Sequence, residues 1–345
     1  MINQIVNAAR NAKCSDIHLA VGNRCMLRLN GALVPAPFSL SDEQIQQLIL
    51  SLCSKEQLAL LSEGSDIDFA FQTPEGFRQR VNIYQQQGRI AAAIRLLNDN
   101  IPTLADLHLP ESIQMLAEQP RGLVLVTGPT GSGKSTTLAA MIDHINQIRA
   151  CHILTIEDPI EYLHTDKRAM IHQREIGRDV RSFSDALRSA LREDPDVILV
   201  GEMRDFETIS AAVTAAETGH LVLSTLHTTG ASQTVDRIVD VCPPQAQQQM
   251  RGQLSTVLKG VVTQALLPLE SGTGRTVATE ILLGTDAVLN LIRENKSYQL
   301  TSCMQSGGSS GMHTFDSDLS MLLRRGLISK ATALEWAFSP RDLMI

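Results

Sequence analysis

One short motif constrains the fold of this chain more than any other feature. Residues 128–135 read Gly-Pro-Thr-Gly-Ser-Gly-Lys-Ser and match the phosphate-binding loop pattern G-x-x-x-x-G-K-[ST] at every fixed position. The run before the motif, 123–127, is short, apolar and β-branched, which is typical of a buried strand. The run after it, 135–148, has apolar residues at helical spacing. This order of strand, glycine loop and helix predicts a nucleotide-binding α/β protein.

Each part of the loop has an expected role. The glycines allow successive backbone N–H groups to turn inward around phosphate oxygens. The N-terminus of the following helix adds a positive field. We expect Lys134 to reach the outer phosphates and the Ser135 hydroxyl to bind Mg²⁺.

Length and composition set broad limits. A chain of 345 residues with 43% apolar residues favours two domains with packed cores. The net charge of −7 argues against a protein that coats nucleic acid, because such binding needs clustered Lys and Arg. We expect no signal peptide, no membrane span of about 20 apolar residues, and a reducing cytosolic setting for the scattered cysteines.

Residues 1–98 are predicted to form an α+β domain. Strands are expected at 16–21, 26–29, 66–72, 77–86 and 90–97, with a turn at Asn30–Gly31 and a helix capped by Ser41. Residues 99–106 interrupt the pattern and are predicted to be a linker.

From residue 107 onward, helices are expected to alternate with short apolar strands. The strands are predicted at 122–127, 151–156, 197–200 and 220–225. Such alternation favours a mainly parallel sheet with helices on both faces and ligands at the carboxyl ends of the strands. We predict a core over 107–284 and a helical segment over 285–345, in which two helices follow a glycine- and serine-rich loop at 306–311.

An acidic residue follows one of the predicted core strands. Glu202 comes directly after the apolar run 197–200 and Gly201. At the carboxyl edge of the sheet, its carboxylate could orient or deprotonate an attacking water. The alternative is an ordinary surface glutamate that happens to follow a strand.

A second strand ends in a cluster of carboxylates, with Glu157, Asp158 and Glu161 within five residues. Like charges at this density are costly unless a cation or waters share them. Mg²⁺ held partly through water is the natural counter-ion. A solvated acidic turn is the alternative interpretation.

Two histidines flank a third strand, His220 before it and His227 after it. A neutral imidazole can donate to a γ-phosphate oxygen and report its loss. The alternative is that each is a hydrogen-bonded structural histidine. Arginines could supply positive charge at a transition state, and in a ring they can complete a neighbour's site. The alternative is that they simply face solvent. The candidates are Arg78, Arg80, Arg89, Arg95 and Arg275.

Taken together, these motifs resemble a known family. The sequences at 128–136, 155–162, 194–205 and 218–228 follow one another as they do in the secretion-superfamily ATPases. Within that superfamily, the chain is most similar to the type IV pilus retraction (twitching motility, PilT-type) branch. Further similarity at 15–19, 290–294 and 311–316 extends the resemblance over nearly the whole chain.

The resemblance implies a fold, a reaction and a setting. The family has a PAS-like N-terminal domain, a RecA-like ATPase core and a C-terminal helical part, assembled as a homohexamer. It binds ATP with Mg²⁺ and works at the cytoplasmic face of the bacterial inner membrane, as a peripheral protein with no transmembrane segment and no nucleic acid. Its expected partner is the integral platform protein of the pilus machine.

Family roles carry over to matching residues. The implied catalytic residues are Glu202, Glu161 and His227. The implied nucleotide contacts are Gly128, Pro129, Thr130, Gly131, Ser132, Gly133, Lys134, Ser135, Thr136, Arg80, Arg95 and His220. The implied Mg²⁺ site comprises Ser135, Glu157 and Asp158.

The sequence departs from the family at Gly88–Arg89, where the order is usually reversed, and at Leu289, where an arginine is usual. The second change lies in a segment linked to retraction. This change favours a nucleotide-binding accessory subunit as one rival interpretation. A motor for pilus assembly or type II secretion is another, and a DNA translocase, which the expected core fold would also permit, is a third.

Overall fold

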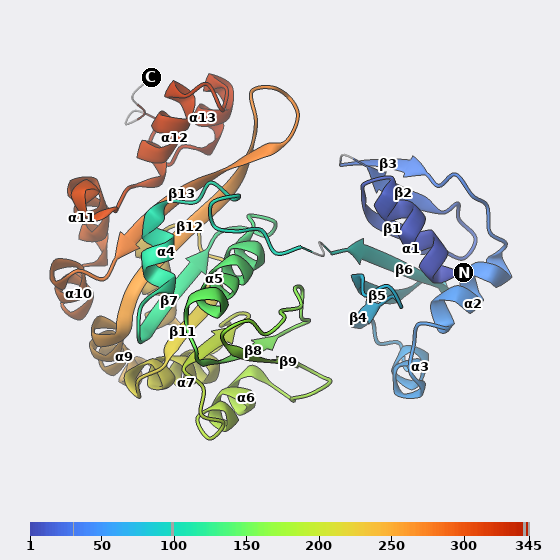
Figure 1. Ribbon diagram of the computed structural model, residues 1–345, viewed down its shortest axis with the longest axis horizontal. Helices are drawn as coiled ribbons and strands as arrows, with labels where there is room; N and C mark the ends of the chain where they lie inside the picture. The colour runs from blue at the N-terminus through green and yellow to red at the C-terminus, as the bar shows by residue number, and fades with distance from the viewer. Residues whose placement is uncertain (30, 98–99, 341–342, 344–345) are drawn as a thin grey trace. The chain divides into compact units, whose positions relative to one another are not determined.

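The computed structural model describes residues 1–29, 31–97, 100–340 and 343. The chain divides into two compact units: Met1–Asn100 with Pro159–Leu163, and Ile101–Asp158 with His164–Ile345 (Figure 1). Asn30 of the expected turn, and residues 98–99 at the expected start of the linker, lie outside the described residues.

The first unit is built on a six-stranded antiparallel sheet in the order β3-β2-β1-β6-β5-β4. The strands are β1 (Cys14–Ala20), β2 (Met26–Leu29), β3 (Ala32–Pro35), β4 (Ile67–Gln72), β5 (Arg78–Gln86) and β6 (Arg89–Leu96). The expected strands are all present, and β3 is the one that the sequence pattern missed. Its residues are largely exposed, so it lacks the alternation that marks a half-buried strand.

Three helices complete the first unit: α1 (Ile2–Asn11), α2 (Asp42–Leu50) and α3 (Lys55–Ser62). Helix α1 turns Ile5, Val6 and Ala9 into the core. The expected cap at Ser41 is confirmed, since its side chain accepts a hydrogen bond from the backbone N–H of Gln44 in a reciprocal capping box.

The second unit contains a seven-stranded sheet in the order β13-β12-β7-β11-β10-β8-β9. Its strands are β7 (Gly122–Thr127), β8 (His152–Glu157), β9 (Met170–Glu175), β10 (Val197–Val200), β11 (Leu221–Leu226), β12 (Leu258–Pro268) and β13 (Arg275–Leu283). All neighbours are parallel except β12 and β13. The predicted α/β class is thus confirmed, and the four expected strands lie within one residue of their predicted bounds.

Helices cover both faces of this sheet (Figure 1). Helices α4 (Glu111–Ala117) and α5 (Lys134–Ile148) pack on one face; α6 (Phe183–Ala190), α7 (Phe206–Glu217), α8 (Ala231–Asp240) and α9 (Pro244–Val257) pack on the other. Successive side chains of β7 point to opposite faces, so Leu123 and Leu125 join one core and Val124 and Val126 the other. Strand β7 therefore holds the phosphate loop on a fully buried support.

The C-terminal helices pack in two places. Helices α10 (Asp286–Arg293) and α11 (Leu300–Ser306) extend the core beside α8 and α9. Helices α12 (Phe315–Arg324) and α13 (Lys330–Trp336) form a separate core with the outer ends of β12 and β13. The two helices expected after the loop at 306–311 are confirmed.

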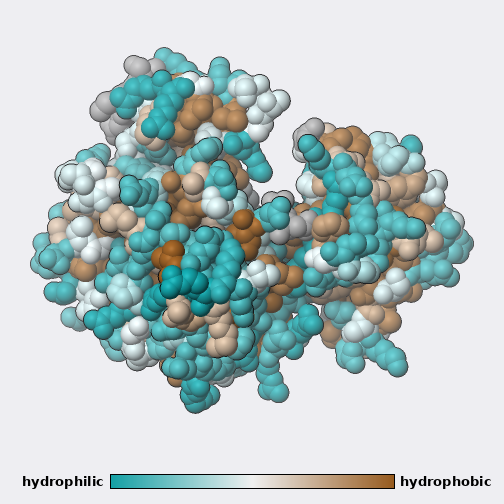
Figure 2. All heavy atoms as spheres, viewed as in Figure 1, coloured by the Kyte–Doolittle hydropathy of each residue, from teal (hydrophilic) through white to brown (hydrophobic). Residues whose placement is uncertain are grey.

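The visible surface is mostly hydrophilic, with small and separate apolar areas (Figure 2). Among the described residues, no helix combines the length and the apolar character that crossing a bilayer would require.

One partly buried histidine of the second unit should make stability depend on pH. Burial lowers the pKa of His164 to about 4; Asp143 opposes this with a smaller upward effect, and Lys167 adds slightly to the lowering. The unfolded chain binds this proton at the ordinary value of 6.5. The stability that the neutral imidazole contributes is therefore present above pH 6.5 and is lost as the pH falls toward 4.

In the wild-type chain, acidification should lower the free energy of unfolding by up to about 3 kcal/mol through His164. We expect the His164→Asn variant to lack this contribution. Urea unfolding of the second unit at pH 7 and at pH 4.5, compared between the variant and the wild-type chain, checks this. Equal pH dependence in the two proteins would contradict it.

Candidate nucleotide-binding and catalytic site

The strand order brings four polar segments to one edge of the second unit's sheet. Strands β7, β11, β10 and β8 are neighbours and all parallel, so their carboxyl ends share an edge. The phosphate loop follows β7, His227 follows β11, Glu202 follows β10, and Glu157 ends β8 with Asp158 behind it. His227 thus follows the strand that separates the phosphate loop from Glu202, an arrangement suited to a ligand at the edge of an α/β sheet.

The phosphate loop depends on backbone conformations that favour glycine. Gly128, Gly131 and Gly133 have φ values of 133°, 79° and 93°. A Cβ atom on Gly128 would lie 2.2 Å from the backbone oxygen of Gln264. Position 128 therefore excludes every other residue, which explains why the first fixed glycine of the motif is needed here.

Lys134 is held inside the loop. It is the first residue of α5 and only 9% exposed. Its Nζ donates to the backbone oxygens of Gly128, at 2.8 Å, and Pro129, at 3.0 Å. These contacts position a cation at the helix N-terminus, where phosphate charge is favoured. Ser135 follows with an exposed side chain.

A buried glutamine that the sequence analysis missed braces the loop from β12. The Nε2 atom of Gln264 donates to the backbone oxygen of Ser132 at 2.7 Å, and its Oε1 accepts from the Thr137 hydroxyl at 2.9 Å. Gln264 is 1% exposed. A polar residue inside the apolar run of β12 is the signal that could have marked it, because a buried amide needs partners.

A cavity of about 640 Å³ adjoins the loop. It is lined by Ser132, Gly133, Thr136 and Thr137 from the loop and α5, by the segment 106–110, and by the outer parts of β12, β13 and α12. Its volume is in the usual range for small-molecule sites and would accommodate the base and sugar of a nucleotide. Arg275, one of the candidate arginines, lies in its wall.

The structure brings Glu202 and His227 together. The Nε2 atom of His227 lies 3.5 Å from Oε2 of Glu202, and Nε of the exposed Arg204 lies 2.8 Å from the same oxygen. The Thr225 hydroxyl donates to the backbone oxygen of Gly201 at 2.6 Å, which ties the segment carrying Glu202 to β11. A carboxylate one fifth exposed, beside an imidazole, can orient a water or accept its proton.

The acidic cluster is divided between the two units. Glu157 accepts hydrogen bonds from the Thr155 hydroxyl at 2.7 Å and from Gln173 Nε2 at 3.2 Å. Asp158 ends this part of the second unit. Glu161 belongs to the segment 159–163, which groups with the first unit, where Arg78 Nε donates to the Ile160 oxygen at 2.7 Å.

His220 lies at the other end of its strand. It precedes β11, whose first residue pairs with Gly122 at the start of β7, whereas the phosphate loop follows the end of β7. A six-residue strand spans about 20 Å. The Nδ1 atom of His220 lies 2.8 Å from the backbone oxygen of Ala215. The expected contact between His220 and a phosphate in this loop is therefore corrected, and we leave His220 out of the site.

Arg80 and Arg95 stand directly opposite each other on β5 and β6 of the first unit. The Nη2 atom of Arg80 lies 2.6 Å from Oδ2 of Asp68, and the Nε atom of Arg95 lies 3.1 Å from Oδ1 of Asp16. The Arg95 side chain is 64% exposed. Because residues opposite each other in an antiparallel pair share a face, the two guanidinium groups rise from the same side of the sheet.

The parallel sheet, the phosphate loop and the carboxylate that follows a strand of the same sheet define a nucleotide-binding protein of the P-loop class. The chain belongs to the Type II/IV secretion system protein family, whose model matches residues 1–314. It is 47% identical over 343 residues, covering 99% of each chain, to a Pseudomonas aeruginosa protein named type IV pilus retractation ATPase PilT.

A "twitching motility protein" of Neisseria gonorrhoeae is 50% identical over 310 residues, covering 89% of this chain and 83% of that protein. The fold also matches a crystal structure described as the pilus retraction motor PilT with bound ADP. That match has a TM-score of 0.92 and 46% identity, and covers 99% of this chain and 98% of the other.

Gln264→Leu is expected to weaken ADP binding by about tenfold, because it leaves Ser132 and Thr137 without their buried partner. Titration of the purified variant with a fluorescent ADP analogue measures the change. Gln253→Leu is the matched control, since the Gln253 side chain donates an exposed hydrogen bond to Glu217. Unchanged affinity in the Gln264 variant would show that this brace is dispensable.

Proposed function

We propose that this chain is a Mg²⁺-dependent ATPase that works as a homohexamer and powers retraction of type IV pili. The observation that carries the hydrolytic part is the meeting of Glu202 and His227 at the sheet edge that also holds the phosphate loop. The full-length similarity to proteins named for pilus retractation and twitching motility supports the mechanical part.

The residues divide the work of hydrolysis among them. Backbone N–H groups of 128–136 surround the phosphates and Lys134 balances their outer charge. Glu202 orients the attacking water and accepts its proton, while His227 contacts the γ-phosphate side of the site. Glu161 is a further catalytic carboxylate, and Arg80 and Arg95 of one subunit add positive charge to the site of a neighbour.

The side chains present fit Mg²⁺. Ser135, Glu157 and Asp158 offer hydroxyl and carboxylate oxygens, the ligands that this ion takes alongside nucleotide phosphates. When bound, Mg²⁺ neutralises charge that develops on the β- and γ-phosphate oxygens. Among the described residues, no group of three His, Cys, Asp or Glu side chains is placed to hold a metal ion.

The proposed organisation follows the same resemblance. Residues 1–98 act as the N-terminal domain, 99–106 as the linker, 107–284 as the ATPase core and 285–345 as the helical segment. The hexamer acts at the cytoplasmic face of the inner membrane against the integral platform protein. Leu289, a residue of α10 that is partly buried against the core, stands where the family usually has an arginine.

Lys134→Ala and Glu202→Ala should both lower ATP turnover at least a hundredfold, for different reasons. The lysine variant should bind ATP poorly, because it loses the loop's buried cation. The glutamate variant should bind ATP normally, because its carboxylate acts on water. Steady-state phosphate release and nucleotide titration of each variant separate the two, and a normal rate in either would refute its role.

The retraction output is tested in cells. The wild-type chain, expressed in Pseudomonas aeruginosa lacking its own PilT, should restore twitching, and the Glu202→Ala variant should not. Absence of rescue by a chain that hydrolyses ATP in vitro would favour assembly, secretion or an accessory role over retraction.

A further inference from the structure

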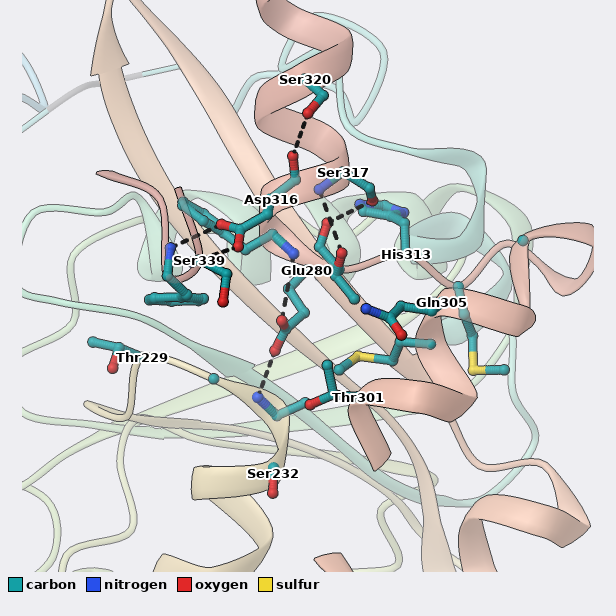
Figure 3. Close-up of a pocket in the computed structure, with 18 of the residues that line it drawn as sticks. Thr229, Ser232, Glu280, Thr301, Gln305, His313, Asp316, Ser317, Ser320 and Ser339 are labelled. Carbon is teal, nitrogen blue, oxygen red and sulfur yellow. Dashed lines mark hydrogen bonds between the residues drawn. The ribbon is translucent and has the colours of Figure 1, made fainter. Parts of the chain in front are cut away.

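A single buried carboxylate joins the N-termini of two helices in the second unit. Glu280 on β13 is 5% exposed. Its Oε1 accepts from the backbone N–H of Ala231 at 2.7 Å, and its Oε2 accepts from that of Phe315 at 3.4 Å. Ala231 begins α8 and Phe315 begins α12. Figure 3 shows Glu280 between the two helix starts, in the wall of a cavity of about 790 Å³.

The two helices belong to different working parts of the chain. Helix α8 begins four residues after His227, so the segment 227–230 connects the catalytic edge directly to the Glu280 contact. Helix α12 lies in the C-terminal helical part and packs on the outer ends of β12 and β13. A shift of the segment 227–230 along the chain would therefore move the Ala231 N–H group that donates to the Glu280 carboxyl group.

The start of α12 is also tied to the nucleotide side of β13. Thr279, next to Glu280 and on the opposite face of the strand, donates from its backbone N–H to Oδ2 of Asp318 at 2.7 Å. Its hydroxyl lies 2.9 Å from Nε2 of His313. Thr279 pairs across the hairpin with Gln264, the residue that braces the phosphate loop. Contacts from both faces of β13 thus converge on residues 313–318.

Glu280 is a costly way to cap a helix. Burial raises the pKa of its carboxyl group, and Asp316 adds to the rise, while the two N–H donors lower it. Helix α12 has a local cap in the Thr314 side chain, whereas α8 follows Gly230 and has no side-chain cap at its own N-cap. A buried acid that reaches two helices from a third element is suited to holding them in register, which a local cap cannot do.

We infer that Glu280 is a positioning residue that couples the segment 227–230 to α12 and so passes the state of the catalytic edge to the C-terminal helices. The inference rests on the proposed function, since it takes the γ-phosphate as the ligand that shifts His227. The coupling is carried by the hydrogen bonds that the Glu280 carboxyl group accepts at two helix N-termini, from Ala231 of α8 at 2.7 Å and from Phe315 of α12 at 3.4 Å.

The test compares Glu280→Gln with Asp316→Asn. Asp316 is the matched control because it is also buried, at 8% exposure, and its oxygens accept from the backbone N–H groups of Phe338, at 2.8 Å, and Ser339, at 2.7 Å. Those contacts stay within the C-terminal part and never reach α8. Amide hydrogen exchange of residues 313–320 is measured with ADP and with a non-hydrolysable ATP analogue, together with turnover and ADP affinity.

In the wild-type chain and in Asp316→Asn, exchange at the start of α12 should differ between the two nucleotides. In Glu280→Gln that difference should vanish and kcat should fall about tenfold, a typical coupling, with ADP affinity unchanged. Glu280→Asp, which keeps the charge but shortens the reach, serves as the second variant if the glutamine variant does not fold, and should lose the difference as well.

Two results would overturn the inference: exchange at α12 that ignores the nucleotide in the wild-type chain, or equal behaviour of the Glu280 and Asp316 variants. If the wild-type chain binds both nucleotides but turns over no ATP, the proposed function fails. The exchange experiment then still decides whether α12 responds to the ligand through Glu280.

Discussion

The nucleotide site depends on the parallel pairing of β7, β11, β10 and β8. Parallel neighbours put all four carboxyl ends at one edge, so a loop, carboxylates and an imidazole that are spread over residues 128–227 come to the same edge. Apolar, β-branched strands buried on both faces make this register rigid. Loss of that order would leave each motif intact in sequence and remove the site.

The antiparallel hairpin β12–β13 carries polar contacts both to the phosphate loop and to the start of α12. Gln264 on β12 braces the phosphate loop, while Thr279 and Glu280 on β13 contact the start of α12 from opposite faces. The period of two along a strand is what separates these directions. The hairpin therefore links the nucleotide side of the molecule to the C-terminal helices through three polar residues in a largely apolar environment.

Local patterns predicted the parts of the structure that local physics determines. The loop, the four central strands and the cap at Ser41 each carry their signal within a few residues. Gln264 and Glu280 were missed because their partners come from segments far away in the chain, and strand β3 was missed because its side chains are exposed. His220 was misplaced because it precedes its strand, and only residues after a parallel strand reach the carboxyl edge.

The central claim is that the residues at this edge hydrolyse ATP. Steady-state phosphate release by the purified wild-type chain, with and without Mg²⁺ and with the oligomeric mass measured in the same buffer, tests it most directly. The account predicts turnover that requires Mg²⁺ and comes from a hexamer. Nucleotide binding without turnover in a correctly assembled hexamer would contradict it and would make the chain a regulatory subunit.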